Sequence, residues 1–422
     1  MHVSAAPNSI DLRVKNHKYI ILGAGPTGLT LAHSLIDSGI AREEILVIEK
    51  EAVAGGLCRS EQVDGAPLDI GGGHFLDVKR KEVLEFVFRF LPESEWDTYV
   101  RVSKIRIGGT EVDHPLEANL WQLPKDAQVD YLESIAQAGC VRDEPMPEAF
   151  ADWIEWKLGT RIAEDYMLPY NRKIWSMDPN ELGTYWLYKL PNVSFRETLR
   201  SCLEGSAHGA LPAHGIFLYP KSFGYGEVWR RMGEALGDSL KLDTAVESID
   251  LEARIVNGEW SADTIVNTIP WTLWNGFCSI PEDIAAHIAK LRNAPIDVDY
   301  HAETLDNPSH WIYEPSEDIP HHRLLLRANF AKGSRGYWTE TNSARAVEPG
   351  EWRHRNEFAY PINTLSKPEA VASICEWAER HGVVGAGRWG KWEHMNSDVA
   401  VAEGLVLAKS LAARVGQGGT AQ

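Results

Sequence analysis

The sequence predicts an α/β fold in which a discontinuous Rossmann-type nucleotide-binding domain is combined with a helical insertion and an antiparallel β-sheet domain. Three observations predict it: a glycine-rich turn between two apolar segments, a long middle region with helical spacing, and a strand-rich region before a final apolar helix. The 422 residues are enough for two or three domains with a sizeable core.

Composition excludes several classes of protein. The chain is 44% hydrophobic and 24% charged, as in an ordinary globular protein, and its net charge of −18 argues against binding of nucleic acid or an anionic membrane. No apolar run reaches the ~18 residues that a membrane span needs. The five cysteines are scattered without a CxxC pair, so we expect no metal site and a cytoplasmic location. An anionic small substrate would need a local cluster of Arg and Lys.

The first element is a strand, turn and helix in "YIILGAGPTGLTLAHSL", followed by a second strand in "EEILVIEK". Gly23, Gly25 and Gly28 form G-x-G-x-x-G, and Glu49 ends the second strand about 20 residues further on. The glycines allow a tight turn and close backbone approach, the helix N-terminus holds a pyrophosphate, and the acid binds ribose hydroxyls. The pattern predicts a dinucleotide site.

Two further glycine-dense loops favour FAD over a nicotinamide cofactor. "EKEAVAGGLCRS" and "PLDIGGGHFLD" follow the second strand, where a nicotinamide dehydrogenase would proceed to its next βα unit. They would let more backbone approach the same cofactor. The alternative is a pair of ordinary glycine turns.

The middle of the chain changes character. Residues 81–90, 127–139 and 150–180 show helical spacing and predict a helical insertion. Residues 216–270 return to a helix, "GEVWRRMGEAL", and short strands, and residues 295–362 are strand-rich.

The final segment, "GRWGKWEHMNSD" and the apolar helix after it, is predicted to be the last strand and helix of the cofactor domain. Asn396 to Asp398 would cap this helix, and its N-terminus would face the pyrimidine end of the flavin. An ordinary capped C-terminal helix is the alternative. The predicted division is a flexible extension (1–17), an FAD-binding domain (18–105, 220–290 and 383–415), a helical substrate domain (116–215) and a β-sheet substrate domain (106–115 and 291–365).

Several motifs resemble those of the UDP-galactopyranose mutases, within the wider amine-oxidase-like FAD proteins. "GGLCRS" and "DIGGGHF" resemble the GGL and D-x-GGH loops, and "LPYNRKIWSMDPNEL" resembles the PYN-x-K-x-W and DP-x-EL segments. "WIYEPSEDIPHHR", "AYPINT" and "GRWGKWEHMNSD" resemble the later motifs of that family. The resemblance runs from about residue 18 to 415.

The resemblance implies an isomerase that interconverts pyranose and furanose forms of a nucleotide-diphosphate sugar, with UDP as the nucleotide that the family suggests. The reduced FAD would attack the anomeric carbon through N5 as the diphosphate leaves, and the ring would open and reclose without net redox change. An electron donor such as NADPH or a flavin reductase would be needed. No side chain need be the nucleophile, because the protein supplies positioning and electrostatics.

The expected site residues fall into three groups. His74, Arg323 and Arg388 are the expected catalytic residues around the flavin. The expected cofactor-binding residues are Gly23, Gly25, Pro26, Thr27, Gly28, Glu49, Lys50, Gly55, Gly56, Leu57, Arg59, Gly72, Gly73, His74, Val246, Gly387, Arg388, Asn396, Ser397 and Asp398. The expected substrate-binding residues are Tyr170, Asn171, Trp175, Lys189, Tyr313, Arg323, Tyr360 and His394.

The required basic cluster is present in the same segments, although any one member could be an ordinary surface residue. It comprises Arg172, Lys173, Lys189, Arg196, Arg200, Arg323 and Arg327. Two departures from the family concern the diphosphate: His394 replaces an expected tyrosine, and Lys189 replaces an expected arginine. The sugar and the nucleotide therefore stay open.

Two alternatives to the mutase remain. An FAD-dependent oxidoreductase of the amine oxidase or desaturase type would share the cofactor half-sites but offer a more apolar substrate tunnel. A flavin-binding protein without catalysis of its own would show no turnover.

Overall fold

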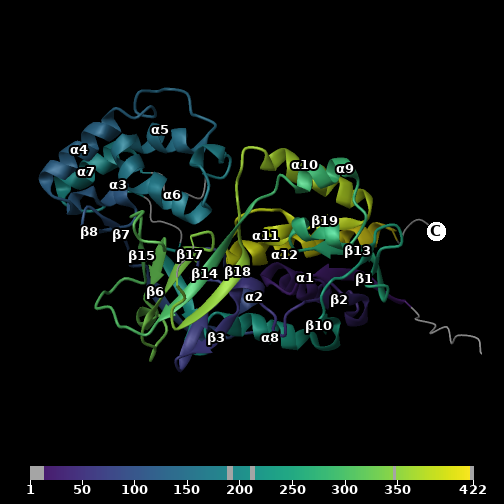
Figure 1. Cartoon of the computed structure of the whole chain (residues 1–422). Helices are drawn as coiled ribbons and strands as arrows, with labels where there is room; N and C mark the ends of the chain where they lie inside the picture. The colour runs from purple at the N-terminus through teal and green to yellow at the C-terminus, as the bar shows by residue number, and fades with distance from the viewer. Residues whose placement is uncertain (1–13, 188–192, 210–213, 346–347, 419–422) are drawn as a thin grey trace, which may run out of the picture.

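The computed structural model describes residues 14–187, 193–209, 214–345 and 348–418. Figure 1 shows a Rossmann-type sheet with helices on both faces, a second sheet beside it, and a group of helices at the far end of that second sheet. The α/β fold class predicted from the sequence, with its Rossmann-type sheet, helical insertion and largely antiparallel second sheet, is confirmed.

The Rossmann-type sheet takes its strands from distant parts of the chain. Its order is β10-β2-β1-β13-β12-β11, with β19 also paired to β13. The strands are β1 (Lys15–Leu22), β2 (Ile45–Ile48), β10 (Leu240–Lys241), β11 (Ile249–Asp250), β12 (Ile255–Val256), β13 (Trp260–Asn267) and β19 (Val383–Gly385). The pairs among β10, β2, β1, β13 and β19 are parallel. Their carboxyl ends therefore share one edge of the sheet, where ligands of such folds bind.

Strand β1 begins earlier than the sequence predicts. Lys15, Asn16 and His17 pair with β13, so these residues are not part of a flexible extension. They carry no apolar signal because the parallel ladder holds them through backbone hydrogen bonds while their side chains stay largely outside the core.

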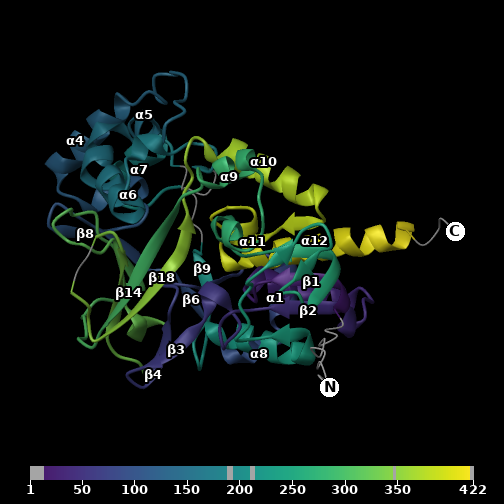
Figure 2. The ribbon, with the colours of Figure 1, turned by 45° about the vertical axis from the view of Figure 1, so that its right-hand side comes forward.

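Helices cover both faces of this sheet. They are α1 (Pro26–Asp37), α8 (Gly226–Leu236), α9 (Glu282–Ile288), α10 (Lys367–Arg380), α11 (Gly387–Gly390) and α12 (Ser397–Gly418). Figure 2 shows α12 running across α1. Gly404 allows this close packing, because a Cβ there would lie 2.9 Å from the Cβ of Thr30.

The second sheet has the order β18-β14-β17-β16-β15-β7-β8. Its strands are β7 (Ser103–Ile107), β8 (Thr110–Asp113), β14 (Asn293–His301), β15 (Trp311–Tyr313), β16 (Arg323–Leu325), β17 (Tyr337–Asn342) and β18 (Trp352–Pro361). Only β15 and β7 pair in parallel among these described strands. Residues 103–105, assigned from the sequence to the cofactor domain, lie in this sheet because they pair with β15 and β8.

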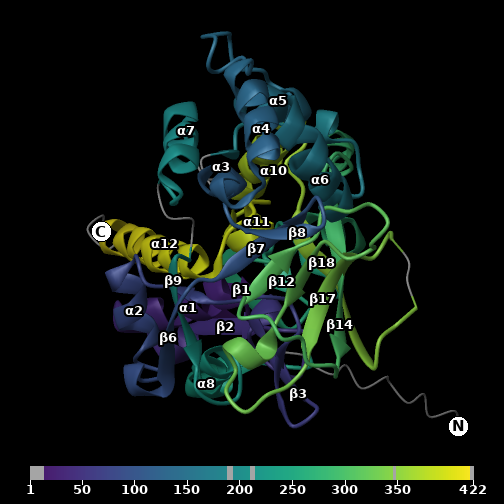
Figure 3. The same cartoon turned by 90° about the vertical axis from the view of Figure 1, so that its left-hand side faces the viewer.

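The helical insertion lies above both sheets in Figure 3. It contains α3 (Leu116–Asn119), α4 (Lys125–Ala136), α5 (Phe150–Ile162), α6 (Leu168–Trp175) and α7 (Phe195–Glu204). The helical stretch expected over residues 150–180 is interrupted. Gly159 has a φ of 76°, and a π-helical turn over Ala163–Met167 joins α5 to α6. Such turns often mark functional sites.

Smaller elements connect these parts. They are the hairpin of β3 (Ser60–Val63) and β4 (Ala66–Asp69), helix α2 (Lys81–Val87), and a sheet of β5 (Leu76–Asp77), β9 (Ile216–Pro220) and β6 (Trp96–Val100). The core includes fully buried Trp229, Trp271, Trp274, Trp338 and Trp392. Within the described ranges, no helix combines the length and apolar character that a membrane crossing requires.

Candidate functional site

The turn between β1 and α1 has the geometry of a dinucleotide site. Gly23 adopts a φ of +100°, and its amide donates to the Ile48 carbonyl over 2.8 Å. A Cβ on Gly28 would lie 2.1 Å from the Gly23 oxygen, so only glycine lets the helix approach the turn. In contrast, no atom lies within 4 Å of the place where a Cβ of Gly25 would be. Pro26 begins α1, and open space over a helix N-terminus suits a phosphate.

Glu49 holds this turn from the end of β2. Its Oε2 accepts from the amide of Ala24 over 2.8 Å, and its Oε1 accepts from the amide of Glu51 over 3.0 Å. Gly55 donates to the Ala24 carbonyl, and Gly56, with a φ of +54°, lies against the Cα of Gly25. The carboxylate keeps acceptor capacity for a ribose, since each oxygen accepts one of these bonds and has a second lone pair.

The other residues predicted on this side have different environments. Arg59 donates from Nε to the carbonyl of Gly56 over 3.0 Å and from Nη1 to Glu51 over 3.1 Å, so it fixes the loop. Lys50 is exposed and pairs with Glu51. Val246 packs against the apolar cluster on one face of the sheet.

The glycines of "DIGGGH" are explained first by protein packing. A Cβ on Gly71 would lie 2.0 Å from the carbonyl oxygen of Leu57, and one on Gly72 would lie 2.4 Å from the Glu340 carboxylate. The amide of Gly73 donates to Glu340 Oε1 over 2.9 Å. The loop is therefore pressed between the preceding glycine loop and the second sheet, which differs from the open approach that the sequence suggests.

His74, the last residue of this loop, is neutral. Its Nδ1 lies 3.1 Å from the carbonyl oxygen of Gly72. A carbonyl only accepts, so Nδ1 carries the proton and Nε2 is left as an acceptor. Burial and the nearby charge of Arg388 lower the pKa of His74 to about 4.

Arg388 is held by backbone rather than by a carboxylate. Its Nη1 donates to the carbonyl of Ala359, and its Nη2 donates to the carbonyl of Met395, both over 2.7 Å. The guanidinium lies 5.8 Å from the ring centroid of Tyr360. Burial lowers the pKa of Arg388, and the group ties α11 to β18.

The C-terminal segment lies against the dinucleotide turn. Gly387, with a φ of +69°, packs on Thr27 at the start of α1, where a Cβ would be 2.7 Å from the hydroxyl. Asn396 accepts from the amide of Ala400 at the start of α12. Ser397 bonds Tyr225 over 2.6 Å. Asp398 is also buried at this N-terminus, and burial raises its pKa.

A second group of predicted residues gathers around Arg323. This arginine stands opposite Glu340 in the β16–β17 pair, and its Nε and Nη2 donate to Glu340 Oε2 over 3.0 and 2.5 Å. Burial disfavours the charged form of both groups, but the attraction between the two opposite charges is stronger. The pKa of Glu340 therefore falls to about 2 and that of Arg323 rises. Nη1 has no partner among the described residues, so it can serve a ligand.

Aromatic residues from three elements surround this arginine. Tyr313 pairs with Arg323 across β15 and β16, and its ring lies 5.5 Å from that of Tyr170 on α6. Tyr360 of β18 lies 4.9 Å from His394 and 6.1 Å from Trp175, centroid to centroid. Burial raises the pKa of Tyr170 and of Tyr360, so both keep their protons. Within the described chain, neither hydroxyl has a hydrogen-bond partner.

Asn171 orients Trp175 instead of offering its amide to the cluster. Its Nδ2 donates to the carbonyl of Met167, and its Oδ1 accepts from the indole Nε1 of Trp175 over 2.9 Å. Both residues are buried on α6. The predicted lining role of Asn171 is therefore indirect.

Most of the predicted basic cluster does not converge on Arg323. Lys173 is buried and donates to the carbonyls of Glu314 and Ser316. Arg327 is buried beneath Tyr300 and donates to backbone carbonyls. Arg172, Arg196 and Arg200 are exposed, and Lys189 lies outside the described residues.

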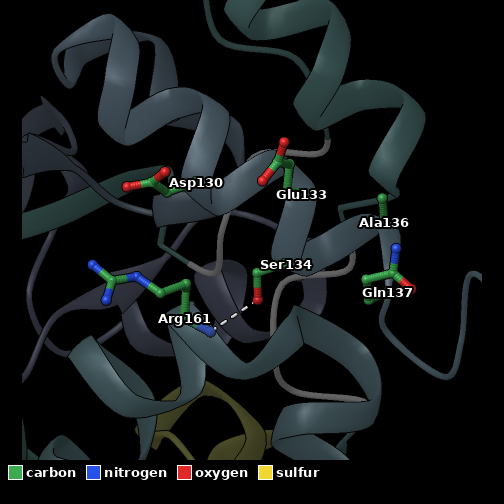
Figure 4. A pocket seen from close by; sticks show the side chains of 6 residues that line it. All are labelled: Asp130, Glu133, Ser134, Ala136, Gln137 and Arg161. Carbon is green, nitrogen blue, oxygen red and sulfur yellow. Dashed lines mark hydrogen bonds between the residues drawn. The ribbon is translucent and has the colours of Figure 1, made fainter.

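Two open surface hollows lie elsewhere. One, of about 640 Å³, is lined by Asp130, Glu133, Ser134, Ala136, Gln137 and Arg161 between α4 and α5 (Figure 4). The other, of about 650 Å³, is lined by Arg172, Ser176, Met177, Asp178, Asn180, Ala344 and Arg345. Neither hollow is lined by His74, Arg323 or the residues around them. The region between His74 and Arg323, where the polar side chains converge, is therefore the candidate site.

Two buried acids and one arginine at this site were not predicted from the sequence. Glu340 joins Arg323 to the Gly73 amide; a charged residue inside the buried strand "YWTETN" was the available signal. Asp69 accepts from Ser60 and from the Tyr225 amide. Arg101 donates to Tyr313.

The comparisons with known proteins agree with this architecture. Residues 21–90 match the model of a family described as an NAD(P)-binding Rossmann-like domain. An uncharacterized protein in the nifH2 3′ region of Methanothermococcus thermolithotrophicus is 36% identical over 94 residues, which are 21% of this chain and 88% of that protein.

Solved structures resemble nearly the whole chain. A reduced UDP-galactopyranose mutase has a TM-score of 0.84 at 21% identity, covering 95% of this chain and 94% of its own. A putrescine oxidase bound to putrescine has a TM-score of 0.59 at 16% identity, covering 94% and 99%. The resemblance to UDP-galactopyranose mutases within a wider group of flavoenzyme-like folds is confirmed at the level of the fold.

Proposed function

We propose that this chain, which belongs to one family with the Methanothermococcus protein and has the fold of UDP-galactopyranose mutase, is a flavin-dependent mutase. It would interconvert pyranose and furanose forms of a nucleotide-diphosphate sugar, with no net redox change. FAD, active in its reduced form, is the proposed cofactor.

One observation carries the proposal. Glu340 holds Arg323 through Oε2 and the Gly73 amide through Oε1, so a fixed cation lies one side chain away from the glycine loop that ends at His74. The free Nη1 and the tyrosine hydroxyls around it suit the oxygens of a diphosphate. An apolar amine or a polyene would leave these groups unsatisfied.

The residues present fit FAD. The space above Gly25 and the turn fixed by Glu49 would take the pyrophosphate and a ribose, and the N-terminus of α12 would take the pyrimidine end. When bound and reduced, the flavin would supply the nucleophile for the anomeric carbon.

The side chains of this chain would supply the remainder. Arg323 would stabilise the negative charge on the diphosphate as its bond to the sugar breaks, and Tyr170 and Tyr360 would donate to its oxygens. His74 would present a neutral acceptor at Nε2 toward the cofactor. Trp175, fixed by Asn171, would form an aromatic wall of the cleft.

The test is turnover under anaerobic conditions. Purified protein reduced with dithionite is incubated with a panel of UDP- and other nucleotide-linked sugars, and the products are separated by chromatography. We expect a new isomeric peak only with the reduced protein, and the active sugar names the substrate. Arg323→Met should lower kcat/KM by about 100-fold or more, whereas Arg172→Met, on the exposed side of α6, should leave it unchanged.

A different outcome would redirect the assignment. If no sugar isomerises and none perturbs the flavin spectrum, while the oxidised protein turns over amines or unsaturated substrates, an oxidoreductase of the amine oxidase or desaturase type is the correct class. If the protein binds flavin and turns over neither set, it is a binding protein.

The partners remain part of the proposal. An electron donor such as NADPH or a flavin reductase would reduce the flavin, which is followed as bleaching of its absorbance. His394, which contacts Tyr360, bears on the choice of sugar nucleotide. We also propose a cytoplasmic location, because all five cysteines carry free thiols.

A further inference from the structure

Arg101, at the junction of β6 and β7, is anchored on one side of Tyr313. Its Nε donates to the hydroxyl of Ser103 over 2.8 Å, and its Nη2 lies 3.1 Å from the Nδ1 of His114. The guanidinium also lies 4.7 Å from the ring centroid of Trp311. These contacts fix the plane and the position of the guanidinium.

His114 is suited to anchor this arginine. Arginine has donors only, so the Nδ1 of His114 must accept and its Nε2 must carry the proton. Burial and the charge of Arg101 hold the pKa of His114 well below its usual value. The imidazole therefore stays neutral and keeps its acceptor across the neutral pH range.

The same Nη2 donates to the hydroxyl of Tyr313 over 3.1 Å. The indole Nε1 of Trp311 donates to that oxygen as well, over 3.0 Å. A phenolic oxygen has two lone pairs, so both are occupied. Tyr313 is left with a single role, which is to donate its own proton, and no acceptor among the described residues takes it.

The Tyr313 hydroxyl belongs to the cluster of residues around Arg323. Tyr313 pairs with Arg323 across β15 and β16, and its ring contacts Tyr170. The cluster thus combines a fixed guanidinium edge with hydroxyls that donate. A ligand that offers only acceptors matches it, whereas a ligand with amino or ammonium groups would face unpaired donors.

We propose that Arg101 is a positioning residue: together with Trp311 it fixes Tyr313 as a hydrogen-bond donor to the diphosphate of the nucleotide sugar. This inference rests on the proposed function, because it names how the same site recognises its anionic group. Arg101 acts through Tyr313 and need not touch the ligand.

The test is a double-mutant cycle on the FAD-bound protein, with UDP as the probe and quenching of tryptophan fluorescence as the readout. We expect Arg101→Met and Tyr313→Phe each to weaken UDP binding by about tenfold. The double variant should bind about as weakly as Tyr313→Phe alone, because Arg101 has nothing left to orient. Arg106→Met removes a charge from β7, the strand that follows Arg101, and should change the affinity less than about twofold.

Turnover separates positioning from folding. In the active sugar assay, Arg101→Met should raise KM as well as lower kcat while FAD content and melting temperature stay near those of the wild type. If Arg101→Met does not fold, Arg101→Lys replaces it in the double-mutant cycle, because lysine keeps the charge and hydrogen-bond donors but lacks the planar guanidinium.

Three results overturn the inference. Additive effects, about 100-fold in the double variant, would mean that Arg101 binds the diphosphate directly. Unchanged UDP affinity in Arg101→Met and Arg101→Lys would remove any role in recognition. Failure of the wild-type protein to bind UDP or any nucleotide sugar would overturn the proposed function together with this inference, whereas the first two results leave the proposed function standing.

Discussion

Two fully buried carboxylates at the site differ in what neutralises them. Glu340 has the guanidinium of Arg323 as its partner, and despite burial its pKa falls to about 2. Asp69 has only the hydroxyls of Ser60 and Tyr219 and the amide of Tyr225, and burial raises its pKa to about 7. The two groups therefore change stability with pH in opposite directions.

Glu340→Gln should remove the acid-sensitive part of this dependence. A folded pKa of about 2 against the ordinary value of 4.5 stabilises the wild type at every pH above 4.5, and this is lost as the pH falls toward 2. Linkage puts the contribution at about 3 kcal/mol. The variant leaves the partly buried Arg323 without its counter-ion, so its free energy of unfolding near neutral pH should fall by about 3 kcal/mol. Urea unfolding from pH 2 to 8 measures both effects.

Asp69→Asn is the matched control. A folded pKa of about 7 against 3.8 destabilises the wild type above pH 7 and is relieved as the pH falls toward 3.8. The control should lose the slope between these values and keep the slope below 4.5. If Glu340→Gln retains the full acid slope, Glu340 is not the ionised partner of Arg323.

At the scale of the elements, the β1–α1 turn was predictable because its signal is local. The spacing of Gly23, Gly25 and Gly28, with Glu49 at the end of the next strand, encodes a turn whose defining contacts, from Gly23 to Gly28 and from Glu49 to Ala24, lie within one strand–helix–strand unit. Glu340 and Arg101 were not predictable in the same way. Their roles depend on which strands pair and in which register, and no local pattern specifies that Arg323 faces Glu340 or that Tyr313 faces Arg323.

Gly25→Ala and Gly28→Ala should separate cofactor binding from folding. The Cβ of Gly28→Ala would lie 2.1 Å from the Gly23 oxygen, so this variant should lose stability by more than about 2 kcal/mol even without flavin. The Cβ of Gly25→Ala meets no protein atom within 4 Å, and a φ of −77° suits alanine. We expect this variant to fold normally but to bind FAD at least about tenfold more weakly, because its methyl group occupies the space proposed for the phosphate.

Both variants and the wild type are compared by their FAD content after dialysis and by the melting temperature of the apoprotein. Equal FAD retention by Gly25→Ala and the wild type would place the phosphate elsewhere. Equal stability losses in the two variants would contradict the packing difference.

At the scale of the whole molecule, Lys173 connects the helical insertion to the second sheet. Its ammonium on α6 donates to the carbonyls of Glu314 and Ser316 over 2.6 and 2.7 Å, just after β15. Burial lowers its pKa to about 8. The sequence placed this lysine among substrate-binding charges because its motif suggested it, but its charge serves the junction between two domains.

Lys173→Met should loosen that junction. The two carbonyls would lose their donor, so amide hydrogen exchange in α6 and in residues 314–316 should become about tenfold faster or more. FAD retention should not change, because the Rossmann-type sheet is untouched. Arg172→Met, the exposed neighbour on α6, should leave exchange unchanged. Unchanged exchange in Lys173→Met would show that apolar packing alone holds the junction.

The discontinuous sheet also bears on how the protein is made. Strand β1 leaves the ribosome roughly 360 residues before β19 and still longer before α12, which at 5–20 residues per second is a delay of roughly twenty to seventy seconds. During that time the nascent chain has its dinucleotide turn but lacks both β19 and the helix that covers α1. Until β19 is made, the edge of β13 that it pairs with is exposed and prone to pair with other chains. A chain that terminates before residue 383 would therefore be bound by chaperones or degraded by proteases rather than act as a smaller enzyme.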